Sequence, residues 1–359
     1  MKRLIACSDG TWNKPGNTDR GQRVETNVER MYQCICSYDT SNNGQPVPQL
    51  KFYDKGIGTG YSWKANLLGG ITGAGIDKNI KDVYTFLILN YEPGDEIYLF
   101  GFSRGAYTAR SIGGLIRNCG ILKPEYIELV DKAYELYRGR DEYTQPDSAM
   151  MVGFRKQFAR EDVTPIKFIG VWDTVGSLGI PLPWYRKWNM KKYLFHDVTL
   201  SHTVENAYHA LAVDERRKMF LPALWEVSDT VKNDPAHPQQ LEQRWFAGVH
   251  SNIGGGYAET GLSDIALRWL AVQAHKTGLC YEEKEYEVIK GNPWGELRNS
   301  YSLPFWLWPP VWRTITLNDA SRQVIDESVL ERFREIYQYR PRNLRKIVRV
   351  DNSNKPVLT

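Results

Sequence analysis

Residues 96–110 constrain the fold of this chain more than any other segment. An apolar run from Ile97 to Phe100 is followed by Gly101-Phe102-Ser103-Arg104-Gly105, and a stretch of small residues suited to a helix comes directly after it. A Gly-x-Ser-x-Gly pattern between a strand and a helix is the nucleophile elbow, a sharp turn that exposes a reactive serine. Glycine is needed two residues before and after the serine because a Cβ atom there would clash. We therefore predict a strand–turn–helix unit that presents Ser103 as a nucleophile.

Four further apolar runs end at turns in the same way. They span Leu4–Cys7, Leu50–Tyr53, Ile166–Trp172 and Trp245–Val249. Short apolar runs that stop at polar or glycine-rich turns are typical of buried strands. The chain is therefore expected to contain at least five strands, including the one that precedes Ser103.

Helical patterns lie between these runs. In the clearest, apolar residues recur at helical spacing from Ile76 to Tyr91, and Pro93-Gly94 closes the pattern. The other helical patterns are Val28–Ile35, Ala106–Ile116, Glu125–Tyr137, Val204–Val213 and Asp264–His275. Strands that alternate with helices form a mostly parallel sheet covered on both faces. Together with the serine turn, this order predicts an α/β-hydrolase fold with helices on both sides of the sheet.

Four polar residues follow the expected strands directly. Asp9, Ser103, Asp173 and His250 each come at or just beyond the end of one of them. In parallel sheets the ligand-binding crevice lies outside the carboxyl ends of the strands. We therefore expect these four residues at one edge of the sheet.

A serine hydroxyl needs a base to take its proton, and the base needs a carboxylate to orient it. In α/β-hydrolases the chain order is serine, acid, histidine. His250 fits the base best, because it follows an apolar strand and opens the glycine-rich loop 251–257. Of the six histidines, which also include His196, four fit less well for a stated reason: His202 and His209 fall in a helical stretch, His237 lies beside prolines, and His275 closes a helix.

Two aspartates compete for the role of the acid. Asp173 ends its strand beside Thr174-Val175-Gly176, where a carboxylate can face the imidazole. Asp214 lies in Asp214-Glu215-Arg216-Arg217, a pattern also expected of a simple ion-pair cluster. We favour Asp173 and keep Asp214 as the alternative.

An oxyanion needs two preorganised N–H donors. The backbone of Arg104, directly after the serine, is the first candidate. The second is expected from the loop after the first strand, with Gly10 and Thr11 as candidates. Asp9 is expected mainly to orient this loop and is kept as a candidate substrate contact.

Composition excludes some functions and leaves the substrate open. The net charge of +4 over 359 residues is too weak to indicate a nucleic-acid partner. The five cysteines show neither a C-x-x-C pair nor a metal-binding spacing, which favours a reducing compartment and predicts no metal and no other cofactor.

The organisation of the chain predicts one domain. No linker or repeat interrupts residues 1–340, while insertions are expected at about 179–200 and 285–315, and 341–359 is expected to be a loosely held basic tail. No window reaches the roughly eighteen apolar residues of a membrane span, and no signal peptide is recognisable. We therefore expect a cytoplasmic protein, with any export by a route that needs no cleavable signal.

Both expected insertions are rich in aromatic residues. Trp184 and Trp188 lie among lysines and arginines, a combination suited to anionic headgroups at a membrane surface, while Trp306 and Trp308 are candidates for an apolar groove or lid. The alternative is ordinary buried packing beside solvated lysines. A lipid substrate and a peripheral membrane contact are the functional expectations.

Several ordered motifs resemble those of a known family. Over about residues 2–275 the chain is similar to the uncharacterised α/β-hydrolase domain family that includes the catalytic domain of type VI secretion phospholipase effectors. The motifs that carry this resemblance are Ser8-Asp9-Gly10-Thr11-Trp12-Asn13, Gly56-Ile57-Gly58-Thr59, Gly101–Ala106, Gly170–Val175, Ala212–Arg217 and Gly248–Tyr257. The resemblance implies hydrolysis of phospholipid esters, with Ser103, Asp173 and His250 at the triad positions. It also implies an inhibitory partner protein if the chain acts as an effector.

Three functions remain open at this point. The first is a serine esterase or phospholipase that works through an acyl-enzyme. The second is an acyltransferase that uses the same residues and excludes water. The third is a hydrolase fold kept as a binding or regulatory module, which the intact Ser–Asp–His set disfavours because a scaffold does not need a strained serine.

Overall fold

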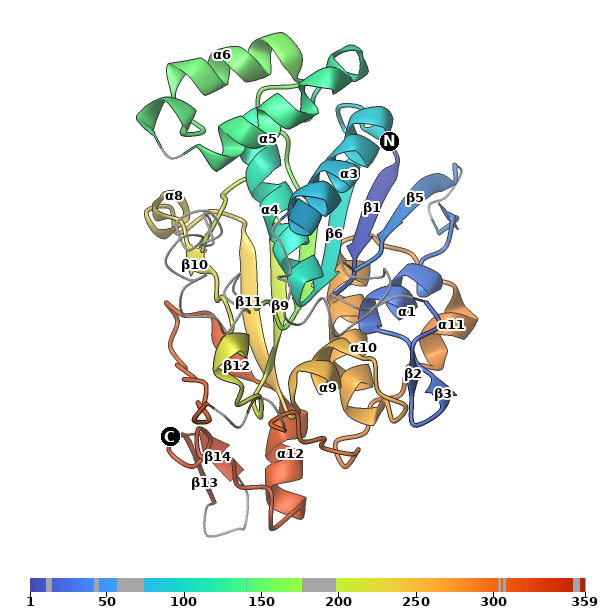
Figure 1. Ribbon diagram of the computed structural model, residues 1–359, viewed down its shortest axis with the longest axis vertical. Coiled ribbons are helices and arrows are strands. Elements are labelled where there is room, and N and C mark those ends of the chain that lie inside the picture. Colours follow the sequence, from blue (N-terminus) through green and yellow to red (C-terminus); the bar gives the residue numbers. More distant parts are fainter. Residues whose placement is uncertain are drawn as a thin grey trace.

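An eight-stranded sheet forms the centre of the described part of the chain (Figure 1). The structure is a computed structural model that describes residues 1–10, 15–41, 45–56, 74–139, 141–175, 198–302, 305, 308–350 and 356–358. The strand order is β12-β11-β9-β7-β6-β1-β5-β4. The strands are β1 (Arg3–Ser8), β4 (Tyr38–Asp39), β5 (Val47–Asp54), β6 (Glu96–Phe102), β7 (Phe168–Trp172), β9 (Asn206–Ala212), β11 (Gln240–Phe246) and β12 (Gln323–Ile325). Every neighbouring pair is parallel except β4 and β5.

Helices cover both faces of this sheet (Figure 1). On one face lie α3 (Ala74–Asn90) and α4 (Arg104–Cys119), with α5 (Val130–Arg138) and α6 (Ala149–Phe158) packed against them. On the other lie α1 (Asn27–Cys34) and α10 (Gly261–Lys276). At the β12 end, α12 (Glu327–Glu335) packs against β11. None of the helices in the described ranges is both long and apolar enough to cross a membrane.

The remaining elements are short. The helices are α8 (Asp229–Lys232), α9 (His250–Gly254) and α11 (Glu283–Glu287), with 3₁₀ turns at Pro124–Leu129, Glu142–Thr144 and Lys218–Phe220. The strands are β2 (Thr18–Asp19), β3 (Gln22–Arg23), β8 (Thr199–Leu200), β10 (Glu226–Val227), β13 (Val348–Val350) and β14 (Pro356–Leu358). The described residues between α11 and β12 form no α-helix or strand of their own.

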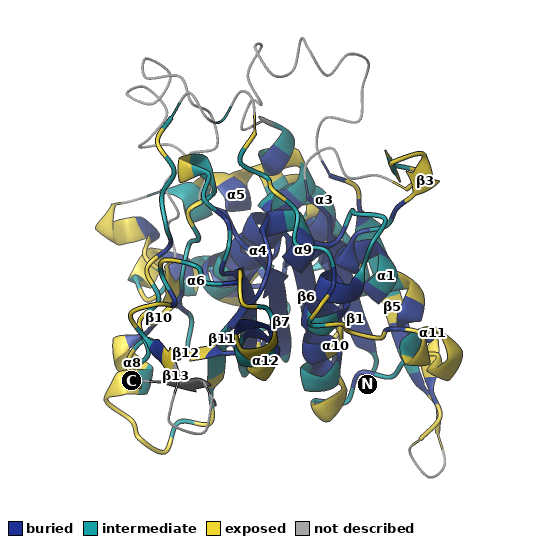
Figure 2. Ribbon diagram, turned by 90° about the horizontal axis from the view of Figure 1, so that it is seen from below, coloured by how far each residue is buried: buried dark blue, intermediate teal, exposed yellow. Residues whose placement is uncertain are grey.

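The core lies on both faces of the sheet, which is buried between the helices (Figure 2). Successive side chains of a strand point to opposite faces. Leu4 of β1 accordingly packs with α3 and α4, while the next residue, Ile5, packs with α1 and α10. Central strands therefore need apolar residues at almost every position, which explains the continuous apolar runs in the sequence.

The order of the strands reverses direction around β1. The chain runs from β1 outward to β5, and then returns to pair β6 with the other side of β1. A crevice outside the carboxyl ends of the strands at such a switch point is the usual ligand site of an open parallel sheet. Asp9 follows β1 and Ser103 follows β6, so both lie at this point of the sheet.

The predicted α/β-hydrolase fold is confirmed, and so is the clearest helix. The apolar stripe expected from Ile76 to Tyr91 is buried in α3 and the residue that follows it. The strands expected at 4–7, 50–53 and 97–102 all form, as does most of 166–172. The strand expected at Trp245–Val249 begins earlier and ends at Phe246.

Two expected helices differ from the structure. Residues 204–213 were expected to be helical but contain β9, a central strand of the sheet. A strand buried on both faces shows no alternation, so its periodicity does not distinguish it from a buried helix. The helix expected at 125–137 is divided into a 3₁₀ turn that starts at Pro124 and the helix α5.

The expectation of a loosely held tail at 341–359 is wrong for its first part. Leu344 and Val348 are buried, and they pack in the apolar cluster beside β11 and α12. Asn343 also donates from Nδ2 to the carbonyl oxygen of Val213, over 2.9 Å. The basic composition of this segment predicts an exposed tail, because its described lysines and arginines face outward, and it does not reveal the few apolar residues that are buried.

Candidate functional site

Ser103 occupies the turn between β6 and α4 in a strained conformation. Its φ of 58° and ψ of −117° fall where non-glycine residues are rare. The turn is held to the neighbouring strand, because the Ser103 N–H donates to the carbonyl oxygen of Trp172 over 3.0 Å. Of the four described non-glycine residues with positive φ, two are Ser103 and Asp173. Backbone strain of this kind clusters at functional sites.

The two glycines of the turn are required by close backbone contacts. A Cβ atom on Gly101 would lie 2.3 Å from the carbonyl oxygen of Gly105. A Cβ atom on Gly105 would lie 1.9 Å from the carbonyl oxygen of Ser8, at the end of β1. The spacing Gly-x-Ser-x-Gly therefore lets α4 start directly against the loop that follows β1.

This contact predicts a large loss of stability for Gly105→Ala. The methyl group would meet backbone rather than a movable side chain, so we expect the free energy of unfolding to fall by at least about 2 kcal/mol. Gly153→Ala is the matched control, since Gly153 lies in α6 with nothing within 4 Å of its added Cβ. That change should raise stability by roughly 0.5–1 kcal/mol. Urea unfolding of both variants tests the contact, and equal effects would contradict it.

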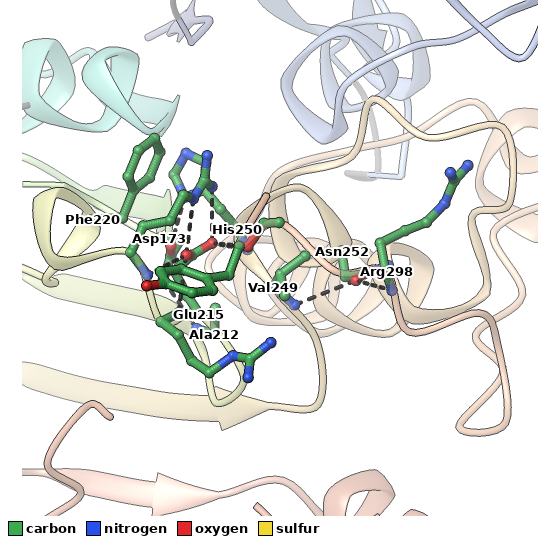
Figure 3. Close-up of polar contacts among 12 residues, drawn as sticks. Asp173, Ala212, Glu215, Phe220, Val249, His250, Asn252 and Arg298 are labelled. Atoms are coloured by element: carbon green, nitrogen blue, oxygen red, sulfur yellow. Dashed lines mark hydrogen bonds and ion pairs between the residues drawn. The ribbon is translucent and has the colours of Figure 1, made fainter. Parts of the chain in front are cut away.

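Asp173 and His250 contact each other across the carboxyl ends of β7 and β11. The distance from His250 Nδ1 to Asp173 Oδ2 is 2.6 Å (Figure 3). Asp173 is fully buried directly after β7, and His250 is the first residue of α9. The structure thus brings together the acid and the base that the sequence favoured.

Arg313 is a further partner of Asp173 that sequence reasoning missed. Its two terminal nitrogens lie 2.5 Å from Oδ1 and 2.9 Å from Oδ2 of the carboxylate. Oδ1 also accepts the backbone N–H of Ala212 over 3.0 Å. Burial alone would raise the pKa of Asp173, but Arg313 and His250 hold it below its usual range. No motif surrounds Arg313, so the sequence carried no signal for it.

The His250 ring packs against two aromatic rings. Its centroid is 4.6 Å from that of Phe102, the residue before Ser103, and 4.9 Å from that of Phe220. The imidazole therefore packs directly beside the serine turn. Burial lowers the pKa of His250, and the hydrogen bond with Asp173 opposes this shift. The neutral form is the one that can accept a proton.

Glu215 anchors the backbone around His250. It is buried, and its Oε2 accepts the N–H of His250 over 3.2 Å (Figure 3). The same oxygen accepts the hydroxyl of Ser300 over 2.9 Å. Arg217 pairs with the same carboxylate at 2.9 Å, which lowers the pKa of Glu215 to about 2 despite its burial. Glu215 lies within the motif Ala212–Arg217 that carries the family resemblance, so the sequence contained a signal for it, but we predicted no role for this residue.

Asp214 does not reach the histidine. Its Oδ2 accepts the backbone N–H of Gly248 over 2.8 Å and the hydroxyl of Tyr339 over 3.0 Å. Burial raises the pKa of Asp214 to about 6. The geometry therefore separates the two aspartates, with Asp173 beside the imidazole and Asp214 in a backbone-anchoring position.

The loop after β1 departs from the expected arrangement. The Gly10 N–H donates to Oδ1 of Asp9 over 2.6 Å, so it is already occupied. Asp9 is buried, and its Oδ2 accepts from Thr26 and Tyr53, each over 2.6 Å. Asp9 therefore orients the loop, as the sequence predicted, and its contact with substrate stays a prediction.

The structure describes only some of the remaining candidate site residues. Arg104 is the first residue of α4, directly after Ser103, as an oxyanion donor requires. Trp308 is half-buried and accepts the Tyr301 hydroxyl on its carbonyl oxygen. The remaining candidates, Thr11, Trp184, Trp188 and Trp306, lie outside the described residues.

In the parts of the chain that the structure describes, no three His, Cys, Asp or Glu side chains gather in a way that could hold a metal ion.

Comparison with known proteins gives a family and distant relatives. Residues 2–273 match the family described as "T6SS, Phospholipase effector Tle1-like, catalytic domain". The uncharacterized protein YEL023C of Saccharomyces cerevisiae (strain ATCC 204508 / S288c) is 32% identical over 237 residues, which cover 61% of this chain and 32% of the yeast protein. The chain thus spans about a third of the length of this curated relative.

Two solved structures resemble the fold more distantly. The crystal structure of an uncharacterized protein from Pseudomonas aeruginosa has a TM-score of 0.45 and 16% identity, covering 81% of this chain and 49% of that one. The Tle1 effector bound to the VgrG spike of the type 6 secretion system has a TM-score of 0.40 and 19% identity, covering 72% and 52%. The family match itself spans most of the chain and includes Ser103, Asp173 and His250. The chain therefore belongs to the Tle1-like phospholipase effector catalytic domain family.

Proposed function

We propose that this protein is a serine hydrolase that cleaves carboxylic esters of lipids through an acyl-enzyme. The observation that carries the proposal is the buried Asp173–His250 pair, packed through Phe102 against the strained turn of Ser103. Asp173 engages Nδ1 of the imidazole and so leaves Nε2 as the nitrogen that accepts a proton. This division of roles is the one that a serine nucleophile needs.

The reaction proceeds in two halves. Nε2 of His250 takes the proton of the Ser103 hydroxyl as Oγ attacks the ester carbonyl carbon. The resulting oxyanion is stabilised by the N–H of Arg104 and by a second donor from the loop after β1. The imidazolium then protonates the departing alcohol, which leaves Ser103 acylated. Water, deprotonated by His250, releases the acid in the same way and restores the serine.

Family membership supports a phospholipid as the ester. The family is named for the catalytic domain of phospholipase effectors, and the match includes every residue of the proposed triad. Aromatic side chains adjoin the site, because the Phe305 ring lies 6.1 Å from that of Phe220, which itself lies 4.9 Å from the His250 ring. A lipid substrate presented at a membrane surface, and an inhibitory partner if the chain acts as an effector, follow from the same proposal.

A lipid panel tests the substrate class. We expect the protein to release fatty acid from phosphatidylcholine or phosphatidylethanolamine vesicles, measured by mass spectrometry, with Ser103→Ala as the matched inactive control. Preference for vesicles over the same lipids as dispersed short-chain monomers would support action at an interface. Transfer of the acyl group to an added alcohol with no free acid would indicate the acyltransferase instead. Activity on soluble esters with none on any phospholipid would contradict the lipid assignment.

A further inference from the structure

The contact between Arg313 and Asp173 is unusually complete. Both terminal nitrogens of the guanidinium face the two carboxylate oxygens, and the two side chains are 1% and 0% exposed. The arginine is itself held in place, because it also donates to the carbonyl oxygens of Ala212, over 3.0 Å, and of Phe220. A paired arginine in this setting has a single available geometry.

We propose that Arg313 is a positioning residue of the hydrolase site: it fixes the Asp173 carboxylate against His250 and offsets its charge. The inference rests on the proposed function, since it assigns a role within the same triad. It goes beyond that function because it states what Asp173 contributes. Beside a neutralising arginine, the carboxylate acts mainly by orienting the imidazole, and it stabilises the imidazolium less than an unpaired carboxylate would.

The orientation follows from the partners of the carboxylate. Oδ1 accepts from Ala212 and Arg313, and Oδ2 accepts from His250 and Arg313. All four donors are fixed by backbone or by buried contacts, so rotation of the carboxyl group would break at least two hydrogen bonds. The positive φ of 40° at Asp173 also requires such support, because the surrounding contacts must offset its strain.

The charge effect follows from the groups around His250. Negative Asp173 and Glu215 are balanced by positive Arg313 and Arg217. Further titratable groups near this set are buried His209 on β9, whose pKa is lowered to about 3, and Tyr257, whose pKa is raised. The positive charges of Arg110 and Arg298 act on His209 and Tyr257, respectively. Removing Arg313 would leave a net negative charge beside the imidazole. The protonated form of His250 would then be favoured, and its pKa would rise.

Arg313 lies outside the range of the chain that matches the family. The family match ends at residue 273, and Arg313 lies beyond it, between α11 and β12, where the described residues form no α-helix or strand. The same segment contributes Ser300, which donates to Glu215. Residues after the matched range therefore complete the surroundings of the triad.

Three variants of the full chain test this role. Arg313→Gln removes the positive charge, whereas Arg313→Lys keeps the charge but loses the bidentate hydrogen bonds to Asp173. Arg155→Gln is the control for loss of a buried arginine, because the Arg155 side chain is 2% exposed and pairs with an aspartate, the more exposed Asp162, at 2.8 Å, but lies in α6. The readouts are the pKa of His250 from NMR titration of its ring and the acidic limb of the kcat/KM profile.

We expect Arg313→Gln to move both readouts upward by about one pH unit and to lower kcat about tenfold or more. Arg313→Lys should lower kcat but leave the acidic limb of the kcat/KM profile near its wild-type pH. Arg155→Gln should change neither the His250 pKa nor this acidic limb. An unchanged His250 pKa in folded Arg313→Gln would overturn the charge effect, and wild-type kcat in Arg313→Lys would overturn the positioning role. The titration needs no substrate, so failure of the proposed function would show separately, as an inactive wild type.

Discussion

Replacement of Ser103 by alanine is expected to lower ester hydrolysis by about 10⁴-fold or more, because removal of the nucleophile leaves only binding and oxyanion stabilisation. The fold should survive, since Ser103 contributes to the turn through its backbone, whose N–H donates to Trp172 and whose carbonyl accepts from Tyr107. Steady-state hydrolysis and thermal unfolding, measured on the same preparation, separate the two effects.

A second variant, Ser103→Gly, separates the loss of the nucleophile from the relief of backbone strain. Glycine adopts the φ of 58° found here with little strain, whereas alanine retains the strain of the serine. We expect Ser103→Gly to be as inactive as Ser103→Ala but more stable by about 1 kcal/mol. Residual activity near the wild-type level in either variant would remove Ser103 from the mechanism, and equal stabilities would contradict the strained turn.

Asp173→Asn is expected to have the second-largest effect, a loss of about 10⁴-fold in kcat. The amide keeps the shape of the carboxyl group, but it no longer favours the tautomer of His250 that carries its proton on Nδ1. Asp214→Asn is the matched control. Asp214 accepts only from Gly248 and Tyr339 in its described contacts, and an amide oxygen can replace it there. We expect the control to retain activity within about tenfold of the wild type, and a larger loss in Asp214→Asn than in Asp173→Asn would reverse the assignment.

The Asp173→Asn variant also leaves Arg313 buried without a counter-charge. Breaking a buried ion pair in this way costs about 3–5 kcal/mol, so the single variant is expected to unfold more easily. The double variant Asp173→Asn/Arg313→Gln removes both charges and should recover much of that stability without recovering activity. Joint recovery of stability and activity would show that Asp173 matters for folding alone.

The sequence predicted the core of the site because the sheet is parallel. Ser103, Asp173 and His250 follow strands that are far apart in the chain, and a parallel sheet places the carboxyl ends of all its strands at one edge. Strand ends could be recognised from short apolar runs followed by turns, without knowledge of any contact. The structure confirms that Asp173 and His250 meet, and their catalytic roles stay predictions until tested.

Other parts of the site could not be predicted in this way. Arg313 is 140 residues from Asp173 and lies in a segment without regular structure, so no periodicity points to it. The strand β9 was mistaken for a helix, because burial on both faces removes the alternation that identifies strands. Gly10 fits the pattern of an oxyanion donor, but its N–H donates to the side chain of Asp9, and the sequence pattern does not indicate this contact.

Labelling with a fluorophosphonate probe tests the central claim most directly. Such probes react with a serine only where a neighbouring base activates it. We predict that the wild-type protein is labelled on a single peptide containing Ser103, that Ser103→Ala is not labelled, and that His250→Gln is labelled far more slowly. Absence of labelling in the folded wild type, or equal labelling of Ser103→Ala, would contradict the account.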